Sequence, residues 1–161
     1  MVPASISEKI CSLSGILEKT NQWKKEGKKI VFTNGVFDLL HKGHIFSLAQ
    51  AAKEGDKLVI GLNSDSSVKR LKGDNRPIND QEARALLLAA LTMVDAVAIF
   101  EEDTPLNLIT TILPDVLVKG GDYAVDEIAG AKEVIENGGK VVINPILDGF
   151  STTAIIKAIS K

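Results

Sequence analysis

The chain has 161 residues, of which 45% are hydrophobic, enough for one folded domain with its own core. Its formal net charge of -2 provides no strong positive field, so we predict neither nucleic acid nor a membrane surface as a partner. The polar N-terminal region has no long apolar run, which argues against a signal peptide or a membrane span. The single cysteine, Cys11, can form no internal disulfide, and we therefore expect a cytoplasmic location.

Residues 1–28 are expected to form a helical lead-in to the main domain, which would occupy residues 29–161. Within the lead-in, residues 5–26 place apolar side chains at helical spacing. This pattern predicts an amphipathic helix that packs on the domain.

The main domain alternates short apolar runs with longer segments of helical period. The runs lack polar alternation, which is typical of strands buried on both faces of a parallel sheet. The predicted strands are 29–33, 57–61, 95–99, 115–118 and 140–143, and the predicted helices are 43–53, 80–93, 104–112 and 126–137. Asp80 would cap one helix, and Thr104 would cap another with Pro105 at its first position. We predict an α/β fold: a single doubly wound, Rossmann-like domain with a five-stranded parallel sheet.

The loop after the first predicted strand carries the most specific signal in the chain. Gly35 would let the backbone approach a ligand, and the amides that open the next helix can bind phosphate oxygens. His41 and His44, the only histidines, lie three residues apart and would share one face of a helical turn. Both rings could donate hydrogen bonds to a phosphate, bonds that strengthen as charge builds in a transition state.

Two less specific interpretations of the histidines remain open at this point. They could form a metal pair, although no third ligand stands at zinc-like spacing and we predict no metal site in the protein. They could also be surface or capping residues without a catalytic role. The loop lacks the Lys-Ser/Thr of a P-loop and the pattern G-x-G-x-x-G, which weakens kinase and dinucleotide-binding interpretations.

The segment Gly35–His44 resembles the G-x-F-D-x-x-H-x-G-H signature of the cytidylyltransferase-like nucleotidyltransferases. Residues 149–153, Gly-Phe-Ser-Thr-Thr, are similar to the second signature of this superfamily, a Ser/Thr-rich turn that opens the last helix. Within the superfamily the chain is most similar to the heptose-1-phosphate adenylyltransferases. Residues 63–73, 102–105 and 113–123 support this resemblance, which covers residues 28–160.

The resemblance implies the roles of individual residues. His41, His44 and Lys72 would be catalytic. The nucleotide would be bound by Thr33, Asn34, Gly35, Val36, Phe37, Asp38, both histidines, Lys119, Gly120, Asp122, Ser151, Thr152 and Thr153. Asp38 would contact the ribose or hold the loop. Ser151 could cap the last helix while its turn binds phosphate, since both roles use the free amides of a first helical turn.

Several cations could contact the phosphorylated acceptor. Lys69, Arg70, Lys72 and Arg76 lie within eight residues after the second strand, in a segment where Lys72 would stand on a flexible loop. We assign Arg70, Arg76 and Arg84 to acceptor binding. The alternative for the charge run is a solvated helix face. For Lys119 to Asp122, the alternative is an ordinary glycine turn after a strand.

The implied reaction is transfer of AMP from ATP to a sugar 1-phosphate, D-glycero-D-manno-heptose 1-phosphate in these relatives, with Mg²⁺ entering on the triphosphate. A separate sugar kinase would act in the same pathway, and a homodimer is compatible with the resemblance. The nearest alternative is a CTP-dependent glycerol-3-phosphate or other polyol-phosphate cytidylyltransferase, which carries an arginine shortly before the Ser/Thr turn where residues 144–148 have none. An alternative of another class is a nucleotide-binding module without turnover.

Overall fold

The sheet has six parallel strands. The structure, a computed structural model, describes residues 2–160, so Met1 and Lys161, the outer ends of the two predicted segments, lie outside the described residues. The strands are β1 (Ile10–Cys11), β2 (Ile30–Gly35), β3 (Lys57–Asn63), β4 (Ala96–Phe100), β5 (Val116–Gly120) and β6 (Lys140–Asn144), in the spatial order β1-β4-β3-β2-β5-β6. Chain order reverses beside β2, because β3 lies on one side of it and β5 on the other. This is the switch point at which open α/β sheets bind ligands.

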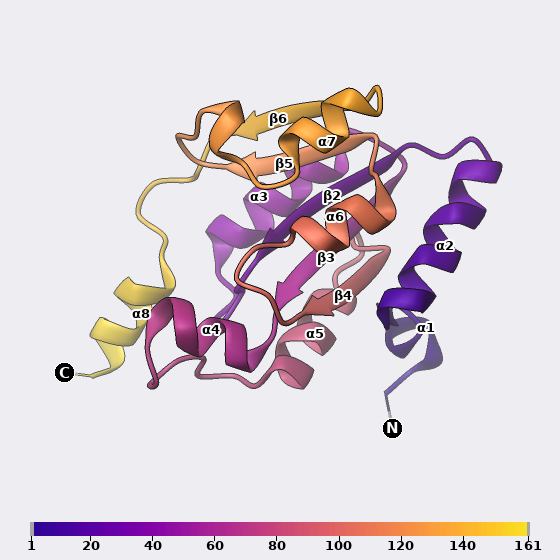
Figure 1. Cartoon of the computed structure of the whole chain (residues 1–161). Coiled ribbons are helices and arrows are strands. Elements are labelled where there is room, and N and C mark those ends of the chain that lie inside the picture. Colours follow the sequence, from indigo (N-terminus) through magenta and orange to yellow (C-terminus); the bar gives the residue numbers. More distant parts are fainter. Residues whose placement is uncertain (1, 161) are drawn as a thin grey trace.

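Helices cover both faces of the sheet (Figure 1). They are α1 (Ala4–Ser7), α2 (Leu13–Lys25), α3 (Lys42–Ala52), α4 (Asp65–Lys72), α5 (Gln81–Ala89), α6 (Leu106–Ile112), α7 (Ala131–Glu136) and α8 (Thr152–Ile159), with a short 3₁₀ turn, η1 (Val125–Glu127). Ile30 and Phe32 face α2, α6 and α7, while Val31 faces α3 and α5. Successive strand residues point to opposite faces, so an unbroken apolar run is the sequence pattern of a strand covered on both sides.

The predicted doubly wound α/β fold is confirmed, but the strand count of five was wrong. The sixth strand is β1, inside the segment predicted to be one continuous helix. Ile10 and Cys11 pair with Val97 and Ala98 of β4, and the amide of Val97 donates to the carbonyl of Lys9 at 2.8 Å. A two-residue edge strand is too short to leave a period in the sequence, and only its pairing with β4 reveals it.

Helix starts and ends were predicted with mixed success. Asp80 caps α5 by accepting a hydrogen bond from the Ala83 amide, as expected. The predicted cap at Thr104 was wrong, because α6 begins at Leu106 with Pro105 in the capping position and without a side-chain cap. Lys72 does not lie on a loop: it is the last residue of α4, which Gly73 ends at a φ of 100°.

The C-terminal helix α8 lies away from β6, at the end of the sheet where the strands point (Figure 1). This arrangement brings the Ser/Thr turn to the loop that follows β2. Within residues 2–160, no helix is long and apolar enough to cross a membrane.

Candidate active site

The loop between β2 and α3 is held in a constrained conformation. Phe37 has a φ of 46°, in the left-handed region that side-chain-bearing residues rarely adopt. Its ring covers Gly35, where an added Cβ would lie only 2.9 Å from ring atom Cε2. The same ring packs edge-on against His44 at a centroid distance of 5.2 Å. The loop therefore places an aromatic ring directly behind one of the two histidines.

His41 and His44 stand together at the start of α3. His41 occupies the N-cap position, and its Nδ1 accepts a long hydrogen bond, 3.4 Å, from the His44 amide. The two rings stack with their centroids 3.8 Å apart. Gly43 makes this possible, since a Cβ there would lie 3.0 Å from the His41 ring and 3.2 Å from Phe150 Cβ.

Both histidines are held neutral at physiological pH. Burial lowers the pKa of His41. Burial and then the neighbouring His41 lower the pKa of His44 to about 4, while a backbone hydrogen bond with Leu39 acts in the opposite direction. Nδ1 of His44 is buried without a hydrogen-bond partner. A neutral imidazole has one N–H group, and in His41, whose Nδ1 accepts a hydrogen bond, this group is on Nε2 and can bind an anion. An arriving phosphate would favour protonation of His44, which would then have a second N–H donor beside the one that binds Leu39.

Three adjoining cavities surround this loop, and Val36 lines all of them. We call them the inner, histidine and outer lobes. The inner lobe lies at the ends of β2, β5 and β6, between Leu48, Val118, Tyr123 and Asn144. The histidine lobe lies between the two histidines, Lys72, Arg76 and the Ser151 turn. The outer lobe lies between Asn63, Lys72, Thr104 and Glu127.

The first two lobes gather nearly all of the residues predicted to be catalytic or to bind nucleotide. The inner lobe is lined by Thr33, Asn34, Gly35, Val36, Phe37, His44, Lys119 and Gly120. The histidine lobe is lined by Val36, Phe37, Asp38, His41, His44, Lys72, Ser151, Thr152 and Thr153. Asp122 is the exception, since it is exposed and lines none of the three lobes.

Ser151 caps α8 by accepting a hydrogen bond from the Ala154 amide at 3.0 Å. The capping role weighed from the sequence is thus confirmed. The same turn lines the histidine lobe, so capping and phosphate binding are compatible in space.

Asp38 ties the histidine loop to the segment before α5. Its carboxylate is only 1% exposed and accepts hydrogen bonds from the amides of Ile78 and Asn79 and from Arg76 Nε, the last at 2.6 Å. Burial acts to raise the pKa of Asp38, but the Asn79 and Ile78 amides and then Arg76 together bring it below its usual value. Of the two roles open for Asp38, these contacts support holding the loop.

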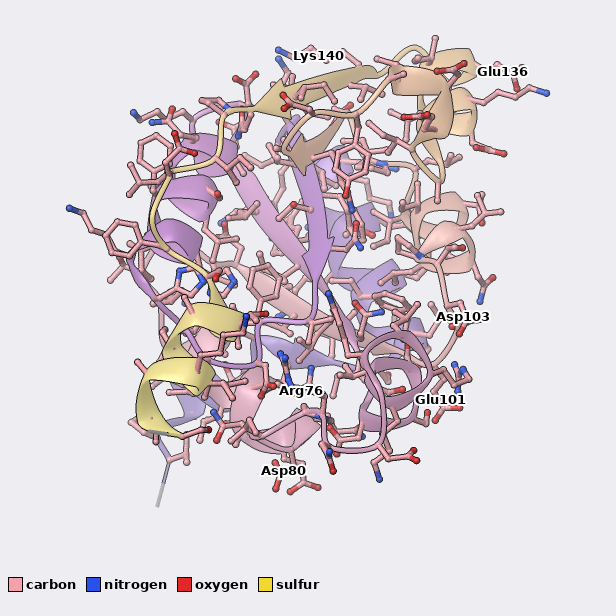
Figure 2. The ribbon with its side chains drawn as sticks, turned by 90° about the vertical axis from the view of Figure 1, so that its left-hand side faces the viewer. Arg76, Asp80, Glu101, Asp103, Glu136 and Lys140 are labelled. Carbon is pink, nitrogen blue, oxygen red and sulfur yellow. The ribbon has the colours of Figure 1, made fainter. Side chains whose placement is uncertain are left out.

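The three arginines predicted to bind the acceptor have different surroundings. Arg76 lines the histidine lobe, and Figure 2 shows it at the end of the sheet near α8. Arg70 is half exposed, pairs with Asp103 and donates to the carbonyl of Glu101. Arg70 lines none of the three lobes, although its partner Asp103 lines the outer one. Figure 2 shows Asp103 and Glu101 farther along the same edge, away from α8.

Arg84 is fully buried and lines no lobe. Its guanidinium donates to the carbonyls of Val36 and Asn63, each at 2.8 Å, and to Asp65 Oδ1 at 2.7 Å. The structure therefore does not place Arg84 or Arg70 against an acceptor. The contacts of Arg84 were not predicted, because its partners stand up to 48 residues away in sequence, where spacing rules on a single helix give no information.

Two lysines border the outer lobe. Lys72 is exposed and also lines the histidine lobe. Lys119 also lines the inner lobe, its Nζ lies 5.2 Å from the centre of the Tyr123 ring, and burial lowers its pKa. Asn63, Asp103, Thr104 and Glu127 contribute polar side chains to the same lobe. The outer lobe thus combines positive charge at its junction with the histidine lobe and hydrogen-bonding groups around it.

Several residues of the site were missed from the sequence, among them Ser47 and Asn144. Ser47 lines both the inner and the histidine lobes. It lies three residues after His44 on α3, so helical spacing could have identified it. Asn144 ends β6 and lines the inner lobe. A polar residue at the carboxyl end of a predicted parallel strand was the available signal.

The fold and the site together define an α/β nucleotide-binding domain with a stacked histidine pair at the switch point of its sheet. The model of the cytidylyltransferase-like family matches residues 32–158. The chain therefore belongs to the cytidylyltransferase-like family. The predicted enzyme class, a nucleotidyltransferase, is confirmed by this match and by the curated relatives.

Those relatives include the bifunctional protein HldE of Rhodospirillum rubrum, 55% identical over 148 residues, which are 92% of this chain and 30% of the relative. HldE of Escherichia coli O139:H28 is 59% identical over 138 residues, 86% of this chain and 29% of the relative. The chain thus spans about a third of the length of the curated relatives it matches.

Solved structures include a lipopolysaccharide core biosynthesis protein from Thermoplasma volcanium, with a TM-score of 0.61 and 33% identity, covering 75% of this chain and 98% of that one. Pantoate-beta-alanine ligase from Francisella tularensis has a TM-score of 0.59 at 17% identity, covering 94% of this chain and 76% of that one. The second likeness shows a shared fold alone.

Proposed function

We propose that the chain transfers AMP from ATP to D-glycero-D-manno-heptose 1-phosphate and releases pyrophosphate. The observation that carries this proposal is the stacked pair His41 and His44 at two adjoining cavities, one at the ends of β2, β5 and β6 and one lined by Lys72 and Arg76. The choice of a heptose acceptor rests on the similarity to HldE proteins, which extends over most of this chain.

The reaction needs no covalent intermediate. An anionic phosphate oxygen of the acceptor attacks the α-phosphorus of ATP, a new P–O bond forms, and the bond to the leaving pyrophosphate breaks. Because the attacking oxygen already carries charge, alignment and charge stabilisation supply most of the rate enhancement. The N–H groups of His41 and His44 would stabilise the charge that develops on the α-phosphate and its leaving oxygen.

Each lobe has a role in this proposal. The inner lobe takes the base and ribose, between the apolar side chains of Leu48 and Val118. The histidine lobe takes the triphosphate, beside Lys72, Arg76 and the first amides of α8. The outer lobe takes the sugar phosphate, with Lys72 and Lys119 near its phosphate and Thr104 and Glu127 near its hydroxyls.

Magnesium would enter with the triphosphate. Residues 2–160 contain no group of three or more His, Cys, Asp and Glu side chains arranged to hold a metal ion. Asp38, the carboxylate nearest to the histidines in sequence, already has its oxygens occupied by two amides and Arg76. These side chains thus provide no set of protein ligands for a metal ion. We propose that Mg²⁺ binds to the triphosphate of the nucleotide and neutralises part of its charge. A separate sugar kinase would supply the sugar 1-phosphate acceptor.

A screen of ATP, CTP, GTP and UTP against sugar 1-phosphates and glycerol 3-phosphate tests this function, with pyrophosphate release and the product mass as readouts. We expect the highest kcat/KM for ATP with heptose 1-phosphate and a product with the mass of ADP-heptose. Parallel assays of the His44→Ala variant separate turnover at this site from a contaminating enzyme. Preference for CTP with glycerol 3-phosphate would overturn the proposed donor and acceptor in favour of the polyol-phosphate alternative.

A further inference from the structure

Two buried side-chain atoms lack a hydrogen-bond partner within the part of the chain that the structure describes: Nδ1 of His44 and Nδ2 of Asn144. Both residues line the inner lobe. His44 is accounted for by the proposed chemistry, whereas Asn144 has no part in it. Asn144 is only 7% exposed, so its unpaired amide group lies in the wall of the inner lobe and is not exposed on the outer surface of the protein.

The backbone holds Asn144 firmly in this position. It is the last residue of β6, pairs in register with Gly120 of β5, and accepts a hydrogen bond from the Gly121 amide at 3.1 Å through its carbonyl. A buried amide donor left unpaired costs about 1–3 kcal/mol, and such groups are rare in folded proteins. A ligand in the inner lobe that accepts a hydrogen bond would remove this cost.

The lobe indicates which part of a nucleotide would be bound there. Leu48 and Val118 give it apolar walls, and the Tyr123 ring borders it with the Lys119 ammonium group nearby. These surroundings fit a flat ring with a polar edge. Lys72 and Arg76 lie in the histidine lobe, which Asn144 does not line, so the triphosphate has a separate place.

A primary amide presents a donor and an acceptor side by side. Adenine presents the complementary pair, its 6-amino group next to N1 or N7, and asparagine pairs with this base through two hydrogen bonds. We propose that Asn144 reads the nucleobase by binding the amino-substituted edge of adenine with its side-chain amide. This inference rests on the proposed function, since the base is that of the ATP donor.

Purine riboside triphosphate, which is ATP without the 6-amino group, tests the inference together with the Asn144→Leu variant. Leucine has the same number and branching of side-chain heavy atoms as asparagine and removes both hydrogen-bonding groups. Calorimetry measures the Kd of each nucleotide and of tripolyphosphate, without any need for turnover. The matched control is Asn21→Leu, an exposed position on α2 outside the three lobes.

We expect the wild-type protein and the Asn21→Leu variant to bind ATP about 10- to 100-fold more tightly than purine riboside triphosphate. In Asn144→Leu this preference falls to about threefold or less, while the Kd of tripolyphosphate is unchanged. Equal weakening of both nucleotides, or an intact preference for ATP, would overturn the inference. If the wild type binds ATP with this preference but transfers no AMP to any acceptor, the proposed function fails and the inference about the base stands.

Discussion

Arg84 Nη1 donates a hydrogen bond of 2.8 Å to the backbone carbonyl of Val36, the residue that all three lobes share. The same nitrogen binds the carbonyl of Asn63 at the end of β3, and Nη2 pairs with Asp65 at the start of α4. A buried cation from α5 thus joins the active-site loop to the strand and helix beside it. Arg84 is a positioning residue, with no direct contact to the lobes.

Replacing Arg84 by methionine should lower the free energy of unfolding by about 2–4 kcal/mol, because three carbonyls and a carboxylate lose their buried partner. Urea unfolding measures this loss. Arg70→Met provides the control, since the Arg70–Asp103 pair is exposed and should contribute no more than about 1 kcal/mol. Equal stability of the two variants would show that the Arg84 network does not hold the fold.

His44→Ala should lower kcat by about a hundredfold or more, the effect expected from loss of a donor to the transition state. The loss of stability should be modest, because the change removes one hydrogen bond, that with Leu39, and the ring contacts with Phe37 and His41. Steady-state kinetics together with a thermal melt separate the two effects. Wild-type turnover in a purified, folded variant would contradict the proposed mechanism.

Stability should fall as the pH is lowered from 6.5 to about 4, and His44 should cause part of this fall. Burial, then His41, bring the pKa of His44 from 6.5 to about 4 in the folded chain. Within that window the unfolded chain binds a proton at His44 and the folded chain does not, so protonation favours unfolding. The contribution of neutral His44 to the free energy of unfolding is therefore fully present above pH 6.5 and is lost as the pH falls toward 4. The difference in Tm between wild type and His44→Gln, measured from pH 7.5 to 4, checks this. A difference that stays constant across the window would argue against the lowered pKa.

Lys72→Ala should raise the KM for a phosphorylated substrate with little change in Tm, because the side chain is exposed and borders two lobes. Lys69→Ala is the matched control: it removes an exposed cation from the same helix at a position outside the lobes. Separate titrations of ATP and acceptor show which substrate depends on Lys72. Equal effects of the two substitutions would indicate a general charge effect instead of a local contact.

The residue order alone determined the layers of the fold and the centre of the site. Apolar runs without polar alternation marked β2 to β6, because strands covered on both faces need no polar side. Asp80 and Ser151 marked helix starts because a capping side chain binds amides only three residues away. The spacing of His41 and His44 placed both rings on one turn for the same reason: these relations are local.

Tertiary structure alone decided the features that depend on distant partners. β1 is a strand only because β4 pairs with it, and two residues cannot carry a periodic pattern. Arg84 and Asp38 became part of the framework because backbone groups 40 to 48 residues away occupy their hydrogen bonds. The amide of Asn144 was left unpaired beside the inner lobe because the packing of three strand ends offered it no partner. Each of these depends on what the folded chain brings near a side chain, which spacing along the sequence does not encode.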